Sequence, residues 1–159
     1  MSQTATGPRR LDQRPQAEDG HPRAARPVLA FAEAINRGDL DAAVQQLAPE
    51  ALHHGRVSNY RPDGVRVLFG MLREVFPDLF FEARDVRVRG SRVVTRFAAT
   101  GTHTGSFLGK APTMEAVAWE SIDIAEVDAG TGLILERHWD LWSDPDLWKR
   151  IGFVPAVMC

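Results

Sequence analysis

The chain has 159 residues, 44% of them hydrophobic, which suits one globular domain with a single core. Its 19 basic and 21 acidic residues nearly balance, so no overall field favours nucleic acid or an anionic membrane as a partner. The one cysteine, Cys159, excludes an intramolecular disulfide and is consistent with a reducing compartment. With no apolar run of about 20 residues and no signal-peptide pattern, the sequence predicts a soluble, cytoplasmic protein.

Residues 1–26 differ in composition from the rest of the chain. They hold one large aliphatic residue, Leu11, among prolines, glutamines, arginines and glycines. So little apolar surface cannot offset the entropy cost of ordering the segment. We therefore expect a disordered N-terminal tail, followed by a single domain over residues 27–159.

Helices are predicted in the first half of the domain. Apolar residues with helical spacing run through 27–38, and Asp39 can cap a second short helix. Residues 50–59 predict a short strand or an irregular crossing. A longer helix is predicted over 62–76, ended by the proline that follows it.

From residue 79 onward the apolar periodicity changes from helical to strand-like. Alternation predicts four strands, over residues 80–89, 92–100, 115–128 and 133–142. Gly90 and Ser91 form a plausible two-residue hairpin turn, and a short helix is predicted over 145–151. Helices followed by an antiparallel meander indicate an α+β fold with a strongly bent antiparallel sheet.

The last predicted strand places Glu136, His138 and Asp140 on one face. The opposite face also mixes charged and apolar residues, a pattern typical of a strand that lines a partly apolar cavity. Asp140, between Trp139 and Trp142, would then be desolvated and its pKa raised, as a group that exchanges protons near neutral pH requires. The alternative is a structural role for Asp140, paired with a neighbouring basic residue or capping the final helix.

Histidines supply further candidates. His103 stands in the glycine-rich loop GTHTG, where it either contacts a ligand or braces the loop. His53 and His54 are adjacent, so only one of them can point inward from an extended segment. His138 can orient Asp140, or bind a metal together with His103 and His54. Because the sequence has no compact metal-ligand spacing or cysteine pair, we expect neither a metal nor another cofactor.

Aromatic residues are concentrated after residue 96. They include Phe107, Trp119 and Trp142, and core packing accounts for most of them. Any of these rings that line a cavity would suit a flat aromatic ligand. The sequence carries no nucleophile elbow, dinucleotide fingerprint or CxxC pair, which argues against acyl-enzyme, nucleotide and redox-cofactor chemistry.

Three segments, FPDLFFEARDV, GTHTGSFLG and ERHWDLWSD, resemble the SnoaL-like polyketide cyclases of the nuclear-transport-factor-2-like group. The resemblance covers residues 27–152. It implies a cone-shaped α+β fold in which a curved antiparallel sheet and N-terminal helices enclose a pocket. It also implies cofactor-free ring closure of a polyketide-derived small molecule by intramolecular aldol condensation, with Asp140 as acid/base and His103 and His54 at the pocket.

By the family's pattern, His54 rather than His53 lines the pocket. The expected substrate contacts are His138, Glu136, Trp142, Phe107 and Trp119. Three alternatives stay open: epoxide opening or hydrolysis, a hydroxylation-related reaction on the same fold, and a non-catalytic small-molecule binding module.

The resemblance further implies a homodimer or homotetramer. A curved sheet with helices on one side leaves its other face in need of cover. Trp119, Val117 and Leu135 are the predicted apolar residues of that face.

Overall fold

The computed structural model describes residues 22–56, 58–140 and 144–152. Most of the predicted tail lies outside the described residues. The last residues of that tail are described, and among them Arg23–Ala25 form a 3-10 turn. Because Ala25 is fully buried, the domain begins before the predicted residue 27. In the described segments, none of the helices has the length and hydropathy that a bilayer span requires.

The predicted helices are confirmed, with small differences at their ends. Helix α1, Arg26–Arg37, has a proline in its first turn and ends at Gly38, whose left-handed backbone (φ 75°) favours glycine. Helix α2, Leu40–Val44, is capped by the Asp39 carboxylate, which accepts a hydrogen bond from the first turn. Helix α3 spans Pro62–Val75.

The sheet has six strands in the order β2-β1-β6-β5-β4-β3. Their bounds are β1 Leu47–His54, β2 Asn59–Tyr60, β3 Phe80–Arg89, β4 Arg92–Thr102, β5 Ala116–Val127 and β6 Ile134–Asp140. The meander from β3 to β6 is antiparallel, as predicted. Strand β1 starts earlier than expected and pairs in parallel with β6, a long-range pairing that local periodicity does not reveal.

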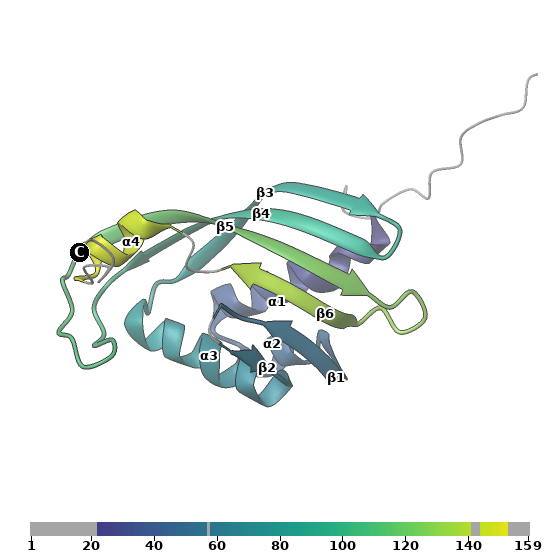
Figure 1. The fold of residues 1–159 in the computed structure, drawn as a ribbon, viewed down its shortest axis with the longest axis horizontal. Coiled ribbons are helices and arrows are strands. Elements are labelled where there is room, and N and C mark those ends of the chain that lie inside the picture. The colour runs from purple at the N-terminus through teal and green to yellow at the C-terminus, as the bar shows by residue number, and fades with distance from the viewer. Residues whose placement is uncertain (1–21, 57, 141–143, 153–159) are drawn as a thin grey trace, which may run out of the picture.

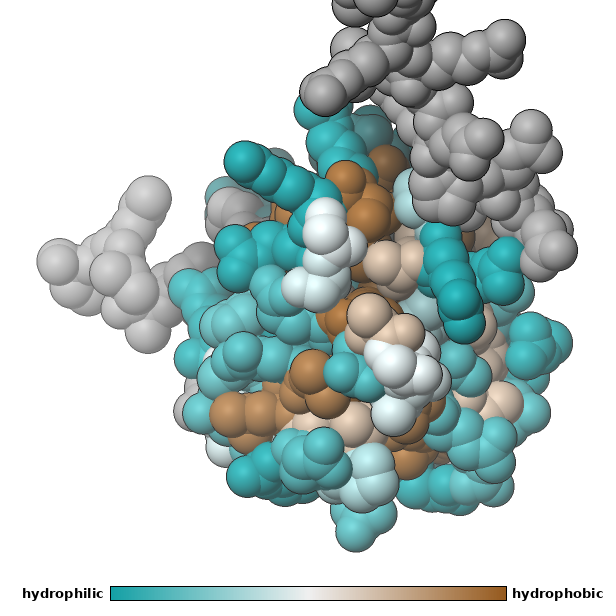
Figure 2. Space-filling model, turned by 90° about the vertical axis from the view of Figure 1, so that its right-hand side faces the viewer, coloured by the Kyte–Doolittle hydropathy of each residue, from teal (hydrophilic) through white to brown (hydrophobic). Residues whose placement is uncertain are grey.

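Helices α1, α2 and α3 lie on one side of the curved, unclosed sheet (Figure 1), and the core fills the space between them. The short helix α4, Pro145–Arg150, lies against β5 at the end of the molecule away from the β3–β4 turn. At the other end hydrophobic side chains reach the surface among hydrophilic ones (Figure 2). The α+β fold with a curved sheet is therefore confirmed.

Candidate functional site

A row of four polar side chains crosses the inner face of the sheet, which is largely apolar. Thr95 of β4 pairs in register with Asp123 of β5, and Arg137 of β6 with His53 of β1. Each of the four is at most 2% exposed. We call this set the inner polar row. Buried charged groups in a small core are uncommon, so the row needs a chemical explanation.

Asp123 and Arg137 form a buried two-pronged ion pair at the centre of the row. Arg137 Nε donates to Asp123 Oδ1 at 2.9 Å, and Nη2 donates to Oδ2 at 2.8 Å. The guanidinium carbon also lies 4.1 Å from the Phe31 ring centre and 4.2 Å from that of Trp139. Burial raises the pKa of the Asp123 carboxyl group, while the charge and hydrogen bonds of Arg137 oppose that rise.

Several atoms of the row make no hydrogen bond within the described part of the chain. These are both ring nitrogens of His53, the Thr95 hydroxyl oxygen and Arg137 Nη1, all buried. Burial and the nearby Arg137 charge lower the pKa of His53 to about 3, so its ring is neutral at physiological pH. Since buried polar atoms are nearly always paired in folded proteins, the row offers donors and an acceptor suited to a polar ligand.

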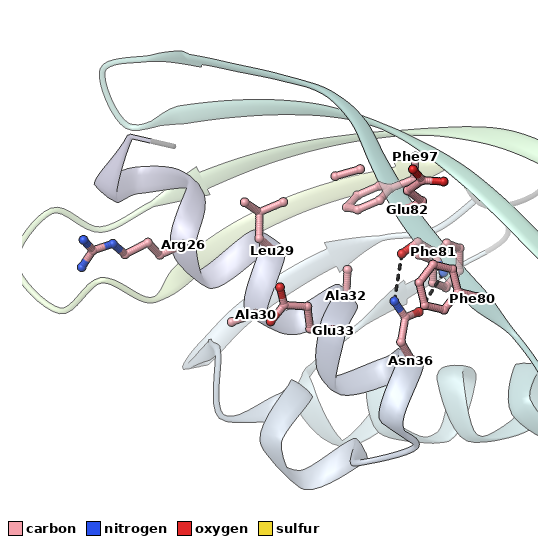
Figure 3. Close-up of a pocket in the computed structure, with 11 residues that line it drawn as sticks. Arg26, Leu29, Ala30, Ala32, Glu33, Asn36, Phe80, Phe81, Glu82 and Phe97 are labelled. Carbon is pink, nitrogen blue, oxygen red and sulfur yellow. Dashed lines mark hydrogen bonds between the residues drawn. The ribbon is translucent and has the colours of Figure 1, made fainter. Parts of the chain in front are cut away.

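A pocket of about 590 Å³ opens between α1 and β3, and Figure 3 shows the residues that line it. Leu29, Phe81 and Phe97 give it an apolar wall, and Glu33 and Glu82 add carboxylates. Asn36 joins α1 to β3 at this pocket through two hydrogen bonds between its side chain and the backbone of Phe81 (Figure 3).

Aromatic rings connect the pocket wall to the inner polar row. The Trp139 ring lies 5.0 Å from the ring of Phe97, with which it is stacked, and 5.0 Å from that of Phe81. Its indole nitrogen donates to the Ser121 hydroxyl at 2.9 Å, and Arg137 covers its face. The pocket and the row are therefore separated by the rings of Phe81, Phe97 and Trp139.

The predicted catalytic face of β6 points the other way. Glu136, His138 and Asp140 do share a face, but that face is the exposed outer one, so the expected desolvation of Asp140 is wrong. The inward residues are Arg137 and Trp139. Arg137 is accommodated inside because Asp123 on the neighbouring strand neutralises it.

The two adjacent histidines are placed in the reverse of the expected order. His53 is buried in the row, whereas His54 lies on the outer face. There His54 Nε2 is 2.6 Å from Glu136 Oε1, and its ring stacks on that of His138 at 4.1 Å. The register of β1 on β6 decides which histidine turns inward, and the sequence pattern does not specify that register.

His103 is fully buried, but it is not part of the row. Its Nδ1 accepts a hydrogen bond from the Thr113 amide at 3.2 Å, and its backbone amide and carbonyl bond Glu115 and Met114. It follows the end of β4, eight residues or about 26 Å along the chain from Thr95. These bonds fit the alternative in which His103 braces the loop.

The predicted aromatic contacts Trp119 and Phe107 are packed in the interior. Trp119, 4% exposed, packs on Phe76 at 5.4 Å, and Phe107, 5% exposed, lies 6.1 Å from Trp148. Trp119 and Val117 were predicted to face outward. This prediction is wrong, because both lie on the same buried face of β5 as Asp123. Trp142 lies outside the described residues.

Asp123 and its partners were missed, although the sequence contains a signal for Asp123. Strand β5 alternates strictly, and its buried phase includes Val117, Trp119, Ala125 and Val127. Asp123 falls in the same phase, so an acidic residue stands on an apolar face. A carboxylate in that position indicates a buried partner or a functional role.

The family model described as SnoaL-like polyketide cyclase matches residues 25–147. The chain belongs to this family. A comparison of its sequence with curated proteins found no match. Among solved structures, this SnoaL-like protein is similar to AclR of Streptomyces galilaeus, a proposed hydroxylase, with 26% identity, a TM-score of 0.73, and coverage of 83% of this chain and 97% of that one.

Two further structures extend the comparison. IdmH of Streptomyces antibioticus, a proposed polyketide cyclase, is 25% identical with a TM-score of 0.66, covering 73% of this chain and 89% of that one. A proposed SnoaL-like polyketide cyclase from Jannaschia sp. CCS1 is 19% identical with a TM-score of 0.75, covering 91% and 99%. The last likeness concerns the fold alone.

Proposed function

We propose that this SnoaL-like protein is a polyketide cyclase that closes a ring by intramolecular aldol condensation, with the inner polar row as its active site. Family membership and the similarity to IdmH support a cyclase-type role. The observation that carries the assignment of the site is the buried Asp123–Arg137 pair beside side-chain atoms that make no hydrogen bond to any described residue. Catalytic groups with perturbed pKa values characteristically occur in such surroundings.

The proposed chemistry uses two groups of the row in sequence. The Asp123 carboxylate takes a proton from a substrate carbon that lies between two carbonyl groups, which leaves an enolate. The enolate carbon attacks a second carbonyl carbon of the same chain, a carbon–carbon bond forms, and the carbonyl oxygen becomes an alkoxide. The alkoxide then takes back the proton from Asp123, so the addition is redox-neutral and loses no atoms.

In this scheme Arg137 and His53 form hydrogen bonds with the substrate oxygens. Arg137 Nη1, which makes no hydrogen bond within the described residues, donates to the oxygen on which charge develops. Neutral His53 donates to or accepts from a second substrate oxygen. For a substrate that enters by the pocket beside α1, the rings of Phe81, Phe97 and Trp139 must turn aside before it reaches the row.

The decisive experiment compares two carboxylates on opposite faces of the sheet. A synthetic linear β-polyketone serves as the probe, with ring closure followed by mass spectrometry and loss of enol absorbance. Asp123→Asn should lower turnover by about 10²-fold or more, whereas Asp140→Asn should not. Melting temperatures of both variants separate lost chemistry from lost folding. The opposite pattern would return the acid/base role to Asp140.

The adjacent histidines give a second matched pair. His53→Asn should weaken probe binding and turnover, while His54→Asn, one residue away on the outer face, should leave both near wild type. If the probe binds and none of the proteins closes the ring, the domain is a small-molecule binding module for this compound.

A hydroxylation-related reaction is a second candidate, favoured by the similarity to AclR. Hydroxylation consumes dioxygen, whereas aldol addition is redox-neutral. An oxygen electrode used with the same probe distinguishes them: turnover that stops under argon and consumes oxygen in air would establish the second candidate.

We also propose that the chain assembles as a homodimer or homotetramer through the outer face of its sheet. That face exposes Ile122, Ile124 and Leu135, each about two-fifths exposed. Ile124→Lys should shift sedimentation at micromolar concentration toward the monomer. A wild-type chain that sediments as a monomer at all concentrations would contradict this assembly.

A further inference from the structure

Three side chains with metal-binding atoms converge on the outer face of the sheet, where β1 and β6 run in parallel. They are His54, Glu136 and His138, and one atom from each lies within 4.8 Å of the others. His54 Nε2 is 2.6 Å from Glu136 Oε1, and His138 Nε2 is 3.9 Å from the same oxygen. We call this set the outer histidine cluster.

The backbone holds this geometry in place. His54 and His138 are partners in the parallel register, which sets their rings face to face at 4.1 Å with only 9° between their planes. Glu136 precedes His138 by two residues and so shares its face of β6. The convergence thus follows from strand pairing and is not the chance meeting of three long side chains.

Asn59 of β2 orients the first of the two rings. Its Oδ1 lies 3.2 Å from His54 Nδ1, and in the tautomer that carries the ring proton on Nδ1 this nitrogen donates to the amide oxygen. The lone pair of Nε2 then faces the Glu136 carboxylate. Histidines that bind metals are characteristically held in this way, with the second ring nitrogen donating to an oxygen.

Both Nε2 atoms lie near the same carboxylate oxygen. We propose that the outer histidine cluster binds a divalent late first-row metal ion such as zinc through His54 Nε2, His138 Nε2 and Glu136 Oε1. Two imidazoles and one carboxylate are a ligand set that such ions accept.

The cluster is independent of the proposed reaction, because the inner polar row lies on the opposite face of the same strands. In the single chain the side chains of His54, Glu136 and His138 are 23%, 49% and 59% exposed, so an ion can enter from solvent before the outer face is covered by another copy. Three protein ligands leave one position of a tetrahedral ion open. The bound ion would tie β1 to β6. His103, once grouped with these histidines, lies elsewhere in a buried loop.

The test uses full-length protein without an affinity tag, dialysed first against a chelator and then against chelator-free buffer. Zinc titrated by calorimetry should bind at one ion per chain, and the melting temperature should rise by a few degrees in excess zinc. Cobalt(II) should develop visible absorption bands of a nitrogen- and oxygen-ligated ion. Glu136→Gln and His138→Ala should each weaken zinc binding by at least about tenfold.

Glu120→Gln is the matched control, since Glu120 is an exposed carboxylate on the outer face of β5, away from the cluster. It should bind zinc as tightly as wild type. Because the varied side chains are exposed, circular dichroism should show all three variants folded. If wild-type protein shows no saturable zinc binding in the micromolar range, the cluster is only an ion pair and the proposal is wrong. Zinc binding that is unchanged in Glu136→Gln and His138→Ala would also overturn the proposal.

Discussion

Removing the positive partner of the buried ion pair tests the centre of the inner polar row. Arg137→Met keeps an apolar stem of similar length but leaves the Asp123 carboxylate buried without its guanidinium. Breaking such a pair from one side costs about 3 to 5 kcal/mol of unfolding free energy. The stacking of the guanidinium on Phe31 and Trp139 is lost in the same change and adds to the cost.

The double variant Asp123→Leu/Arg137→Met supplies the matched control. Because it removes both charges, it should recover most of the stability that the single variant loses. Urea unfolding followed by tryptophan fluorescence measures all three proteins. A single variant that loses less than about 1 kcal/mol, or a double variant no more stable than the single one, would refute the view that Arg137 compensates the Asp123 charge.

The pH dependence of the single variant gives an independent check. Burial raises the pKa of Asp123 in the folded state, and loss of Arg137 removes the main opposing influence. An acid with a raised folded-state pKa binds protons more tightly when folded, so stability rises as pH falls from the folded-state pKa toward the unfolded value of 3.8. Measured against the double variant, Arg137→Met should therefore gain stability as pH falls from the folded-state pKa of Asp123 toward 3.8, by up to about 1.4 kcal/mol per pH unit. A flat difference would mean that Asp123 does not titrate there.

Three further predictions concern the scaffold. Gly105→Ala should cost about 2 kcal/mol and lower the melting temperature by several degrees, because the new Cβ would lie 1.9 Å from the Glu74 carbonyl oxygen. Asp78 accepts hydrogen bonds from the Thr102 amide and hydroxyl, which lower its pKa, so its stabilisation is present above pH 3.8 and is lost as pH falls further. The melting temperature of Asp78→Asn should accordingly fall below that of wild type at pH 7, and the gap should close in acid. Asp39→Ala should lose about 1 kcal/mol in urea unfolding, since it removes the cap of α2.

Local patterns in the sequence were sufficient to predict most of the scaffold. Strand β3 matches its predicted bounds, and the capping role of Asp39 follows from its place before an apolar run. Alternation also assigned residues 136–140 of β6 correctly to two faces, whereas an irregularity in the pairing with β5 leaves Ile134 buried and Leu135 exposed, against the alternation. Which face is buried depends on Asp123, 14 residues away on another strand, and no property of β6 alone contains that information.

The choice between His53 and His54 failed for a related physical reason. Both residues can occupy an extended segment, and a shift of one residue in register exchanges them. Their register is set by a strand near the other end of the chain: His54 and Glu136 are 82 residues apart. Long-range pairing of this kind leaves no periodic trace in a single sequence.

The parallel pairing of β1 with β6 has a consequence for how the molecule folds. Strands β3, β4 and β5 join through short or intermediate connections, so their meander can form early, whereas β1 must wait for a partner that follows it by more than 80 residues. Contacts so distant in sequence form late, since closing a long loop costs chain entropy before any contact offsets it. Until β6 docks, Asp123 stands on an apolar sheet without Arg137, and His53 has no neighbour on that side. A nascent chain released before β6 would therefore carry an uncompensated carboxylate in its core, and it would be a substrate for proteolysis rather than a partly active enzyme.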